Sequence, residues 1–288
     1  MNEIEDMVKE KKNKKENKFK SFYQRSISGI FLIAFLILVL VLGGNVLLIS
    51  LGVLSSIAFL ELLQVFKLNK TLFSYLGIAF IIFYYISIYY YSINGVLLFL
   101  IAFLILLLSF YVFTFPKYTI KEVALVIYGV IYVAIMFSFV YLVRNNEVMG
   151  KYIVWLIFIS SWGSDTFAYL TGLLFGKHKL VPNLSPKKTV EGAIGGVIGS
   201  MVLGAIYCYI VFNKLVDDMT ISTIRVSIGC GVGSIISMIG DLTASAIKRN
   251  YDVKDYGKII PGHGGILDRF DSVIFTAPAL YFILNLFK

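Results

Sequence analysis

A series of long apolar stretches constrains the fold of this chain more than any other feature. Nine of them can be marked, approximately over residues 28–43, 44–66, 71–92, 95–115, 122–144, 151–173, 190–212, 221–247 and 270–287. Several reach the ~20 residues that cross ~30 Å of hydrocarbon at 1.5 Å per residue. Composition agrees, because 58% of the 288 residues are hydrophobic and 15% are charged, against roughly 25% charged in soluble domains. We therefore predict an all-α polytopic membrane protein of about nine transmembrane helices and exclude an ordinary soluble enzyme, a disordered chain and a secreted disulfide scaffold.

Two details bear on the number and nature of these spans. Gly43 and Gly44 separate the first two stretches, and they are compatible either with a tight turn or with a hairpin that does not fully cross the membrane. Cys208 and Cys230 both lie inside apolar stretches. This placement predicts small core residues and not a disulfide or a metal pair.

The basic residues predict the orientation of the chain. With the N-terminus in the cytoplasm, 21 of the 26 Lys and Arg residues fall on the cytoplasmic side of a nine-span chain, as the positive-inside rule requires. We interpret residues 1–26 as a basic cytoplasmic tail on anionic lipid, with no role in binding nucleic acid. About five helices over 27–150 follow. A C-terminal membrane domain over 151–288 comes next, with long cytoplasmic loops at 174–189 and 248–269, and we expect the active site at this inner-leaflet face.

Acidic residues inside the spans are candidates for function, because an ionisable group costs a few kcal/mol at the bilayer centre. Asp165 and Asp241 each lie seven or eight residues from the inner end of a span, which predicts a common level about 10 to 12 Å below the interface. Glu191 lies at the mouth of the seventh span. For Glu61, a snorkelling side chain or an interhelical hydrogen bond is at least as good an interpretation as a functional role.

Small residues recur every four positions in the seventh and eighth spans, a pattern typical of close helix packing. They are Gly192, Gly196, Ser200 and Gly204, and then Gly229, Gly233 and Ser237. The second stripe continues through Asp241 and Ser245 to Lys248, so packing aims a carboxylate, a hydroxyl and a basic group toward one pocket. The stripes also make a homodimer plausible.

The segment 245–271 combines the groups that bind phosphates and divalent metals. Lysine and arginine neutralise phosphoryl oxygens, and glycines around His263 allow backbone N–H groups to approach an anion. Asp268 and Asp271, together with Asp241, offer the hard oxygen ligands that magnesium prefers. A plain solvated loop would need none of these features, so we interpret the segment as part of a site.

The segment closely resembles the signature of the phosphatidate cytidylyltransferase (CDP-diacylglycerol synthase) family. The matching positions are Ser245, Lys248, Arg249, Lys254, Asp255, His263, Gly264, Gly265, Asp268, Arg269 and Asp271. A second block that is similar to the family contains Asp165, Lys187, Lys188, Thr189 and Glu191. The resemblance covers about residues 160–272, whereas the earlier spans match only in number and in being apolar.

The resemblance implies transfer of a cytidylyl group from CTP to phosphatidate, giving CDP-diacylglycerol and pyrophosphate for phospholipid biosynthesis. It implies Mg²⁺, with or without a second monovalent or divalent ion, bound by the acids at Asp241 and Asp268. It also implies a multi-pass protein of a prokaryotic cytoplasmic membrane, with CTP, phosphatidate and bilayer lipid as partners. Phosphatidate is a phosphomonoester, and a phosphomonoester with a second pKa of about 6 needs no general base.

The expected roles divide the matching residues into two groups. The catalytic group is Asp241, Asp268, Lys248, Arg249, Asp271 and His263. In this group the basic residues hold the triphosphate, and His263 is a hydrogen-bond donor that positions the substrate. The substrate-binding group is Asp165, Lys187, Lys188, Glu191, Ser245, Lys254, Asp255, Gly264, Gly265 and Arg269. Thr189 is expected to cap the seventh span, so that Lys187 and Lys188 lie at a helix N-terminus suited to a phosphate.

Two alternatives stay open on the sequence alone. One is a related CTP-dependent enzyme that acts on another lipid, such as an ether-lipid cytidylyltransferase or a polyprenol kinase. The other is a membrane carrier for an anion, coupled to ions at Asp165 and Asp241. The carrier would function without the long loop at 248–269, whereas the enzyme requires it.

Overall fold

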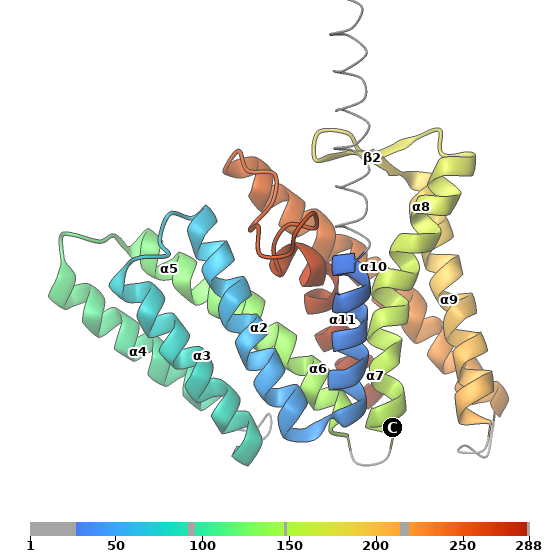
Figure 1. Cartoon of the computed structure of the whole chain (residues 1–288), viewed down its shortest axis with the longest axis horizontal. Helices are drawn as coiled ribbons and strands as arrows, with labels where there is room; N and C mark the ends of the chain where they lie inside the picture. Colours follow the sequence, from blue (N-terminus) through green and yellow to red (C-terminus); the bar gives the residue numbers. More distant parts are fainter. Residues whose placement is uncertain (1–26, 92–95, 147–148, 214–218, 287–288) are drawn as a thin grey trace, which may run out of the picture.

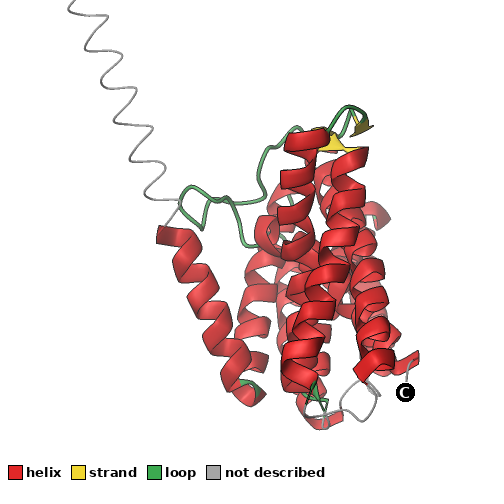
Figure 2. Ribbon diagram, turned by 90° about the vertical axis from the view of Figure 1, so that its right-hand side faces the viewer, coloured by secondary structure: helices red, strands yellow, loops and turns green. Residues whose placement is uncertain are grey.

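The computed structural model describes residues 27–91, 96–146, 149–213 and 219–286, and the predicted tail at 1–26 lies outside these ranges. Helices dominate the described residues (Figures 1 and 2). Their bounds are Ile27–Leu42, α2 Gly44–Val65, α3 Leu72–Tyr91, α4 Val96–Thr114, α5 Ile120–Gly129, α6 Met136–Arg144, α7 Gly150–Phe158, α8 Ser164–Phe175, α9 Val190–Phe212, α10 Met219–Asn250 and α11 Leu267–Leu286. Each predicted apolar stretch overlaps a helix, which confirms an all-α polytopic membrane protein.

Seven helices in the described part of the chain are long and apolar enough to cross a membrane. Two of these spans contain a π-helical turn that the sequence did not predict: η2 (Val130–Ile135) joins α5 to α6, and η3 (Ile159–Gly163) joins α7 to α8. A π-turn inserts an extra residue and re-aims the side chains that follow it. The η3 turn directly precedes the helix that carries Asp165.

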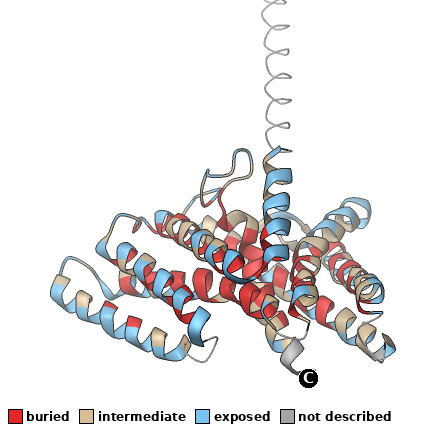
Figure 3. Cartoon of the chain, turned by 60° about the horizontal axis from the view of Figure 1, so that its bottom comes forward, coloured by how far each residue is buried: buried red, intermediate tan, exposed pale blue. Residues whose placement is uncertain are grey.

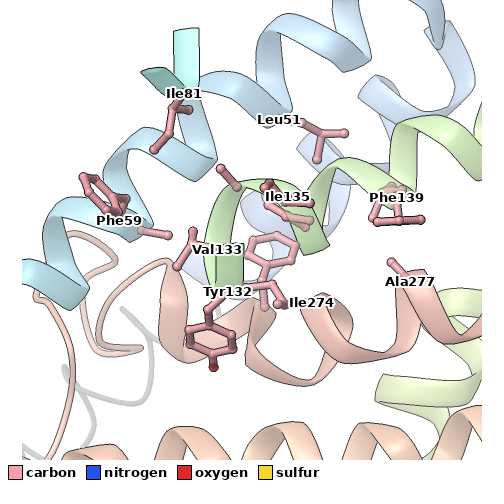
Figure 4. Close-up of a cluster of buried hydrophobic side chains, with 14 of the residues drawn as sticks. Leu51, Phe59, Ile81, Tyr132, Val133, Ile135, Phe139, Ile274 and Ala277 are labelled. Atoms are coloured by element: carbon pink, nitrogen blue, oxygen red, sulfur yellow. The ribbon is translucent and has the colours of Figure 1, made fainter. Parts of the chain in front are cut away.

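Residues of α2, α3, η2, α6 and α11 contribute much of the buried apolar cluster, and Figure 3 shows buried residues gathered in the middle of the molecule. Phe59, Ile81, Val133 and Ile274 are among its members, and in Figure 4 the hydroxyl of Tyr132 points away from the labelled apolar side chains. This packing joins the N-terminal helices to the last helix of the chain. The helices that carry the site therefore have a rigid apolar support on one side.

The glycine stripe on α9 is used for packing within the chain. A Cβ on Gly196 would meet Ser164 and Ala168 of α8, and a Cβ on Gly204 would meet Cys230 of α10. Close approach of three backbones therefore requires these glycines. Cys230 and Cys208 are free and fully buried, as predicted.

The long segment between α8 and α9 contains a two-stranded antiparallel hairpin that the sequence did not predict, formed by β1 (Lys179–Val181) and β2 (Ser185–Thr189). Strand β2 runs directly into α9, where Thr189 accepts a hydrogen bond from the N–H of Gly192 at 3.1 Å. This confirms the predicted cap. The hairpin and the segment between α10 and α11 lie at the same end of the helical bundle (Figures 1 and 2).

Candidate active site

A cavity of about 380 Å³ lies below these two segments, and we call it the acidic cavity. Four carboxylates from three helices line it: Asp165 of α8, Asp241 of α10, and Asp268 and Asp271 of α11. Ser28, Gly29, Leu32, Ile33, Trp162, His263 and Arg269 complete much of its wall. Asp165 and Asp241 thus meet at one level, as their depth in the spans predicts.

A second cavity, of about 410 Å³, extends from the acidic cavity toward the hairpin, and we call it the hairpin cavity. Its lining combines basic and apolar side chains. Lys187, Lys188 and Thr189 line it together with Leu173, Leu180 and Met238. Such a lining suits a molecule with an anionic end and an apolar body.

Asp165 and Asp241 line both cavities and so form their shared wall. The ammonium of Lys188 forms an ion pair with Oδ2 of Asp241 at this wall, and both side chains are about a quarter exposed. Asp165 forms no salt bridge among the described residues. The wall therefore carries two carboxylates, of which only Asp241 is in direct contact with Lys188.

A third cavity, of about 490 Å³, lies within the segment after α10, and we call it the loop cavity. Lys254, Asp255, Gly257, Lys258, His263, Gly264 and Arg269 line it, and His263 and Arg269 also line the acidic cavity. Basic side chains thus continue from the acidic cavity toward the open end of the bundle. This arrangement suits an elongated anion such as a triphosphate.

Asp268 has the most extensive set of contacts in the site. Its Oδ1 accepts a hydrogen bond from Lys248 Nζ at 2.7 Å, and its Oδ2 accepts from the backbone N–H groups of Tyr256 at 2.8 Å and Gly265 at 3.0 Å. The side chain is 4% exposed and that of Lys248 is 15% exposed. Asp268 therefore fixes the segment between α10 and α11 as well as lining the acidic cavity.

Tyr256 strengthens this arrangement, although no sequence motif marks it. Its hydroxyl donates to the carbonyl of Ala244 on α10 at 3.0 Å, and its ring lies 5.2 Å from Lys248 Nζ. Burial raises the pKa of the Tyr256 hydroxyl above its usual range, so the group stays a neutral donor. The segment is thus attached to α10 by a side chain that carries no charge of its own.

His263 lies in a turn whose glycines are required by the backbone, because Gly262 and Gly264 have φ of 77° and 85°. The turn is closed by the N–H of Ile260 donating to the carbonyl of Gly264 and by the N–H of His263 donating to the carbonyl of Ile260, both at 2.9 Å. The amides of His263 and Gly265 thus bond within the protein. This turn consequently offers fewer free N–H groups to an anion than its glycine-rich sequence suggests.

Ser28, on the helix Ile27–Leu42, fixes the imidazole of His263 from the other side of the acidic cavity. Its hydroxyl donates to the carbonyl of Pro261 at 3.0 Å and lies 2.8 Å from His263 Nδ1. A hydroxyl has one hydrogen, so when Ser28 donates to Pro261, Nδ1 of His263 is the donor in the second contact. No motif marks Ser28, and only its position in the fold reveals it.

Five predicted residues line none of the three cavities: Lys248 and Gly265, which bond to Asp268, and Glu191, Ser245 and Arg249. Glu191 bonds to the chain before the hairpin, accepting from the N–H groups of Lys177 and His178 and lying 2.6 Å from His178 Nδ1. Ser245 and Arg249 lie on the last turns of α10, and Arg249 is exposed. Glu191 thus fixes the start of the hairpin segment, and its contact with substrate stays a prediction.

Comparison with known proteins identifies the family of this chain. Residues 23–287 match the model of a family described as the cytidylyltransferase family. A phosphatidate cytidylyltransferase of Bacillus subtilis is 36% identical over 92% of this chain and 98% of the relative, and one of Staphylococcus haemolyticus is 36% identical over 90% and 98%. A Staphylococcus aureus protein of the same name is 41% identical over 64% of this chain and 68% of the relative. The chain therefore belongs to the cytidylyltransferase family.

Proposed function

We propose that this protein transfers a cytidylyl group from CTP to phosphatidate, giving CDP-diacylglycerol and pyrophosphate. The observation that carries the proposal is the acidic cavity, whose four carboxylates adjoin the basic loop cavity and the hairpin cavity, which is lined by two lysines and by apolar side chains. Two anionic substrates of different shape, one of them a lipid, need such a pair of adjoining cavities. The relatives from Bacillus subtilis and Staphylococcus haemolyticus bear the name phosphatidate cytidylyltransferase, which denotes this activity.

The donors in the acidic cavity fit a magnesium ion. Among the described residues, no group of three or more His, Cys, Asp or Glu side chains is gathered closely enough to form a metal cage. Magnesium does not need one, since it keeps several waters and binds through one or two carboxylates plus substrate phosphates. Asp241 and Asp268 would hold the ion, with Asp165 and Asp271 completing the negative charge. A second ion stays a prediction.

In the reaction, a phosphate oxygen of phosphatidate attacks the α-phosphorus of CTP. A new P–O bond forms, the bond between the α-phosphorus and the bridging oxygen breaks, and pyrophosphate leaves with the electron pair. Bound magnesium would neutralise charge on the phosphoryl oxygens. Lys187 and Lys188 hold the lipid phosphate in the hairpin cavity, and Lys254 and Arg269 hold the triphosphate in the loop cavity. The contribution of these residues is positioning and charge compensation.

The decisive experiment is a product assay with the purified chain in detergent, magnesium, CTP and phosphatidate. We expect pyrophosphate and a cytidine liponucleotide in equal amounts. Parallel reactions with ATP, GTP, ether-linked lipid and polyprenol test the related enzymes, and anion uptake into liposomes tests the carrier. No product from a folded, monodisperse preparation would refute the proposal.

We also propose nine crossings with a cytoplasmic N-terminus, in the plasma membrane of a prokaryote. The distribution of basic residues supports the orientation, because the hairpin segment and the segment after α10 are rich in lysine and lie at one end. Cysteines introduced as Pro182→Cys and Asn213→Cys test it, since both positions are exposed and the native cysteines are buried. An impermeant thiol reagent added to intact cells should label only Asn213→Cys.

The proposed division of the chain at residue 150 and the homodimer both stay predictions. The stripe on α9 that suggested a homodimer contacts α8 and α10 of the same chain. Other helices have exposed faces. Only Phe103 and Leu107 of α4 are buried, so the rest of this helix is available to lipid or to a second copy. Cross-linking in native membranes would decide between a monomer and a dimer.

A further inference from the structure

Glu61 lies near the C-terminal end of α2 and is 4% exposed. Its Oε1 accepts a hydrogen bond from the backbone N–H of Ile266 at 3.1 Å, and its Oε2 accepts from the N–H of Leu267 at 2.9 Å. These amides lie at the start of α11, where backbone N–H groups lack partners inside the helix. A carboxylate from the N-terminal half of the chain therefore supplies them, across 205 residues of sequence.

Two glycines make room for this carboxylate. A Cβ on Gly257 or on Gly265 would overlap with the carboxylate of Glu61. Neither glycine has the left-handed backbone found at Gly262 and Gly264. Space for the Glu61 carboxylate, and not backbone conformation, therefore accounts for glycine at both positions.

The backbone that Glu61 holds is also the backbone that aims Asp268. Asp268 follows Leu267 directly, and its Oδ2 accepts the N–H of Gly265 at 3.0 Å. Glu61 and Asp268 thus hold the stretch 265–267 between them through three backbone hydrogen bonds. Glu61 lines none of the three cavities, and it forms no ion pair among the described residues.

We infer that Glu61 is a positioning residue for the proposed reaction: it fixes the start of α11 so that Asp268 and the glycine turn face the acidic cavity in the reactive arrangement. The inference rests on the proposed function. Its physical basis is that a small displacement of a charged group from the reacting phosphates lowers the rate strongly even when binding is preserved. A negative charge at a helix N-terminus adds favourable electrostatic energy to the two hydrogen bonds.

The first test compares Glu61→Gln with Glu122→Gln. Glu122 is a matched control because its carboxylate also accepts a backbone N–H, that of Thr119, at the start of a helix, α5, away from the site. The amide of Gln supplies only one acceptor, so one of the two α11 amides loses its partner in Glu61→Gln. We expect kcat to fall at least tenfold with KM for CTP and phosphatidate changed less than threefold, and kcat of Glu122→Gln to stay within twofold.

A second variant keeps the inference testable if Glu61→Gln does not fold. Gly257→Ala leaves the charge in place and displaces the carboxylate sterically. We expect the same fall in kcat, and a double variant no slower than the slower single variant, because both changes act through one contact. Hydrogen exchange of the peptide containing Ile266 and Leu267 should be faster in Glu61→Gln and in Gly257→Ala than in the parent chain.

The outcomes separate this inference from the proposed function. An inactive parent chain that is folded would refute the function itself. An active parent chain with kcat within twofold in folded Glu61→Gln or Gly257→Ala would overturn the positioning role. Equal losses in Glu61→Gln and Glu122→Gln would also overturn it, because they would show a general effect of removing a helix-start carboxylate.

Discussion

Replacing the two proposed metal ligands by asparagine should stop turnover in both cases but change stability very differently. In Asp268→Asn, a single amide oxygen faces three donors, namely Lys248 Nζ and the N–H groups of Tyr256 and Gly265. Either the ammonium or the two amides then lose their acceptor in a region where the carboxylate is 4% and the lysine 15% exposed. Removing one partner of a buried ion pair lowers the free energy of unfolding by about 3 to 5 kcal/mol.

Asp241→Asn removes one ion pair, that with Lys188, in which the two side chains are 28% and 26% exposed. Partly exposed pairs contribute about 0 to 1 kcal/mol. We therefore expect Asp268→Asn to melt on the order of 10 °C below the parent chain and Asp241→Asn to melt close to it. Thermal unfolding in one detergent at one scan rate, followed by intrinsic fluorescence, measures this difference.

The product assay on the same preparations completes the comparison. Neither variant should make liponucleotide above background, because each lacks a carboxylate of the acidic cavity. Equal melting temperatures for Asp268→Asn and Asp241→Asn, within about 2 °C, would refute the structural role assigned to Asp268. Near-parent turnover in Asp241→Asn would remove Asp241 from the proposed metal site.

Three further predictions concern the elements around the site. Thr189→Ala should lower the free energy of unfolding by about 1 kcal/mol by removing the cap of α9; an unchanged melting temperature would contradict it. Gly199→Ala places a Cβ against the ring of Phe167 and should cost about 1 to 3 kcal/mol, whereas Gly229→Ala, with ordinary contacts, should be tolerated. Glu191→Ala should speed protease cleavage between α8 and α9, since it frees backbone N–H groups at the start of the hairpin segment; a cleavage rate equal to that of the parent chain would argue against this.

The sequence predicted the helices well because a span leaves a strong local signal. Each stretch carries its own length and hydropathy, and the cap at Thr189 is encoded within three residues. The π-turns at 130–135 and 159–163 carry no such signal, because they depend on how neighbouring helices pack. The hairpin at 179–189 was also missed, since its strands have only three and five residues and the second strand is polar.

The residues of the candidate site also differ in whether a local sequence signal reveals them. Asp165, Asp241 and Asp268 could be selected because a carboxylate in an apolar span or in a glycine-rich segment is unusual in itself. Ser28 could not, because a serine at the start of an apolar stretch is common and its contact with His263 spans 235 residues. Glu61 had a visible signal, a charge inside a span, but its partners are backbone amides that no side-chain pattern reveals.

The ion pair between Lys188 and Asp241 has a consequence for binding kinetics. An anion that binds the ammonium of Lys188 either shares its three donors with Asp241 or competes with Asp241 for them. Each half of the pair thus serves as the counter-ion of the other until a substrate arrives. An anion that contacts Lys188 alone therefore competes with a tethered carboxylate, whereas a lipid phosphate also has the apolar lining of the hairpin cavity to bind.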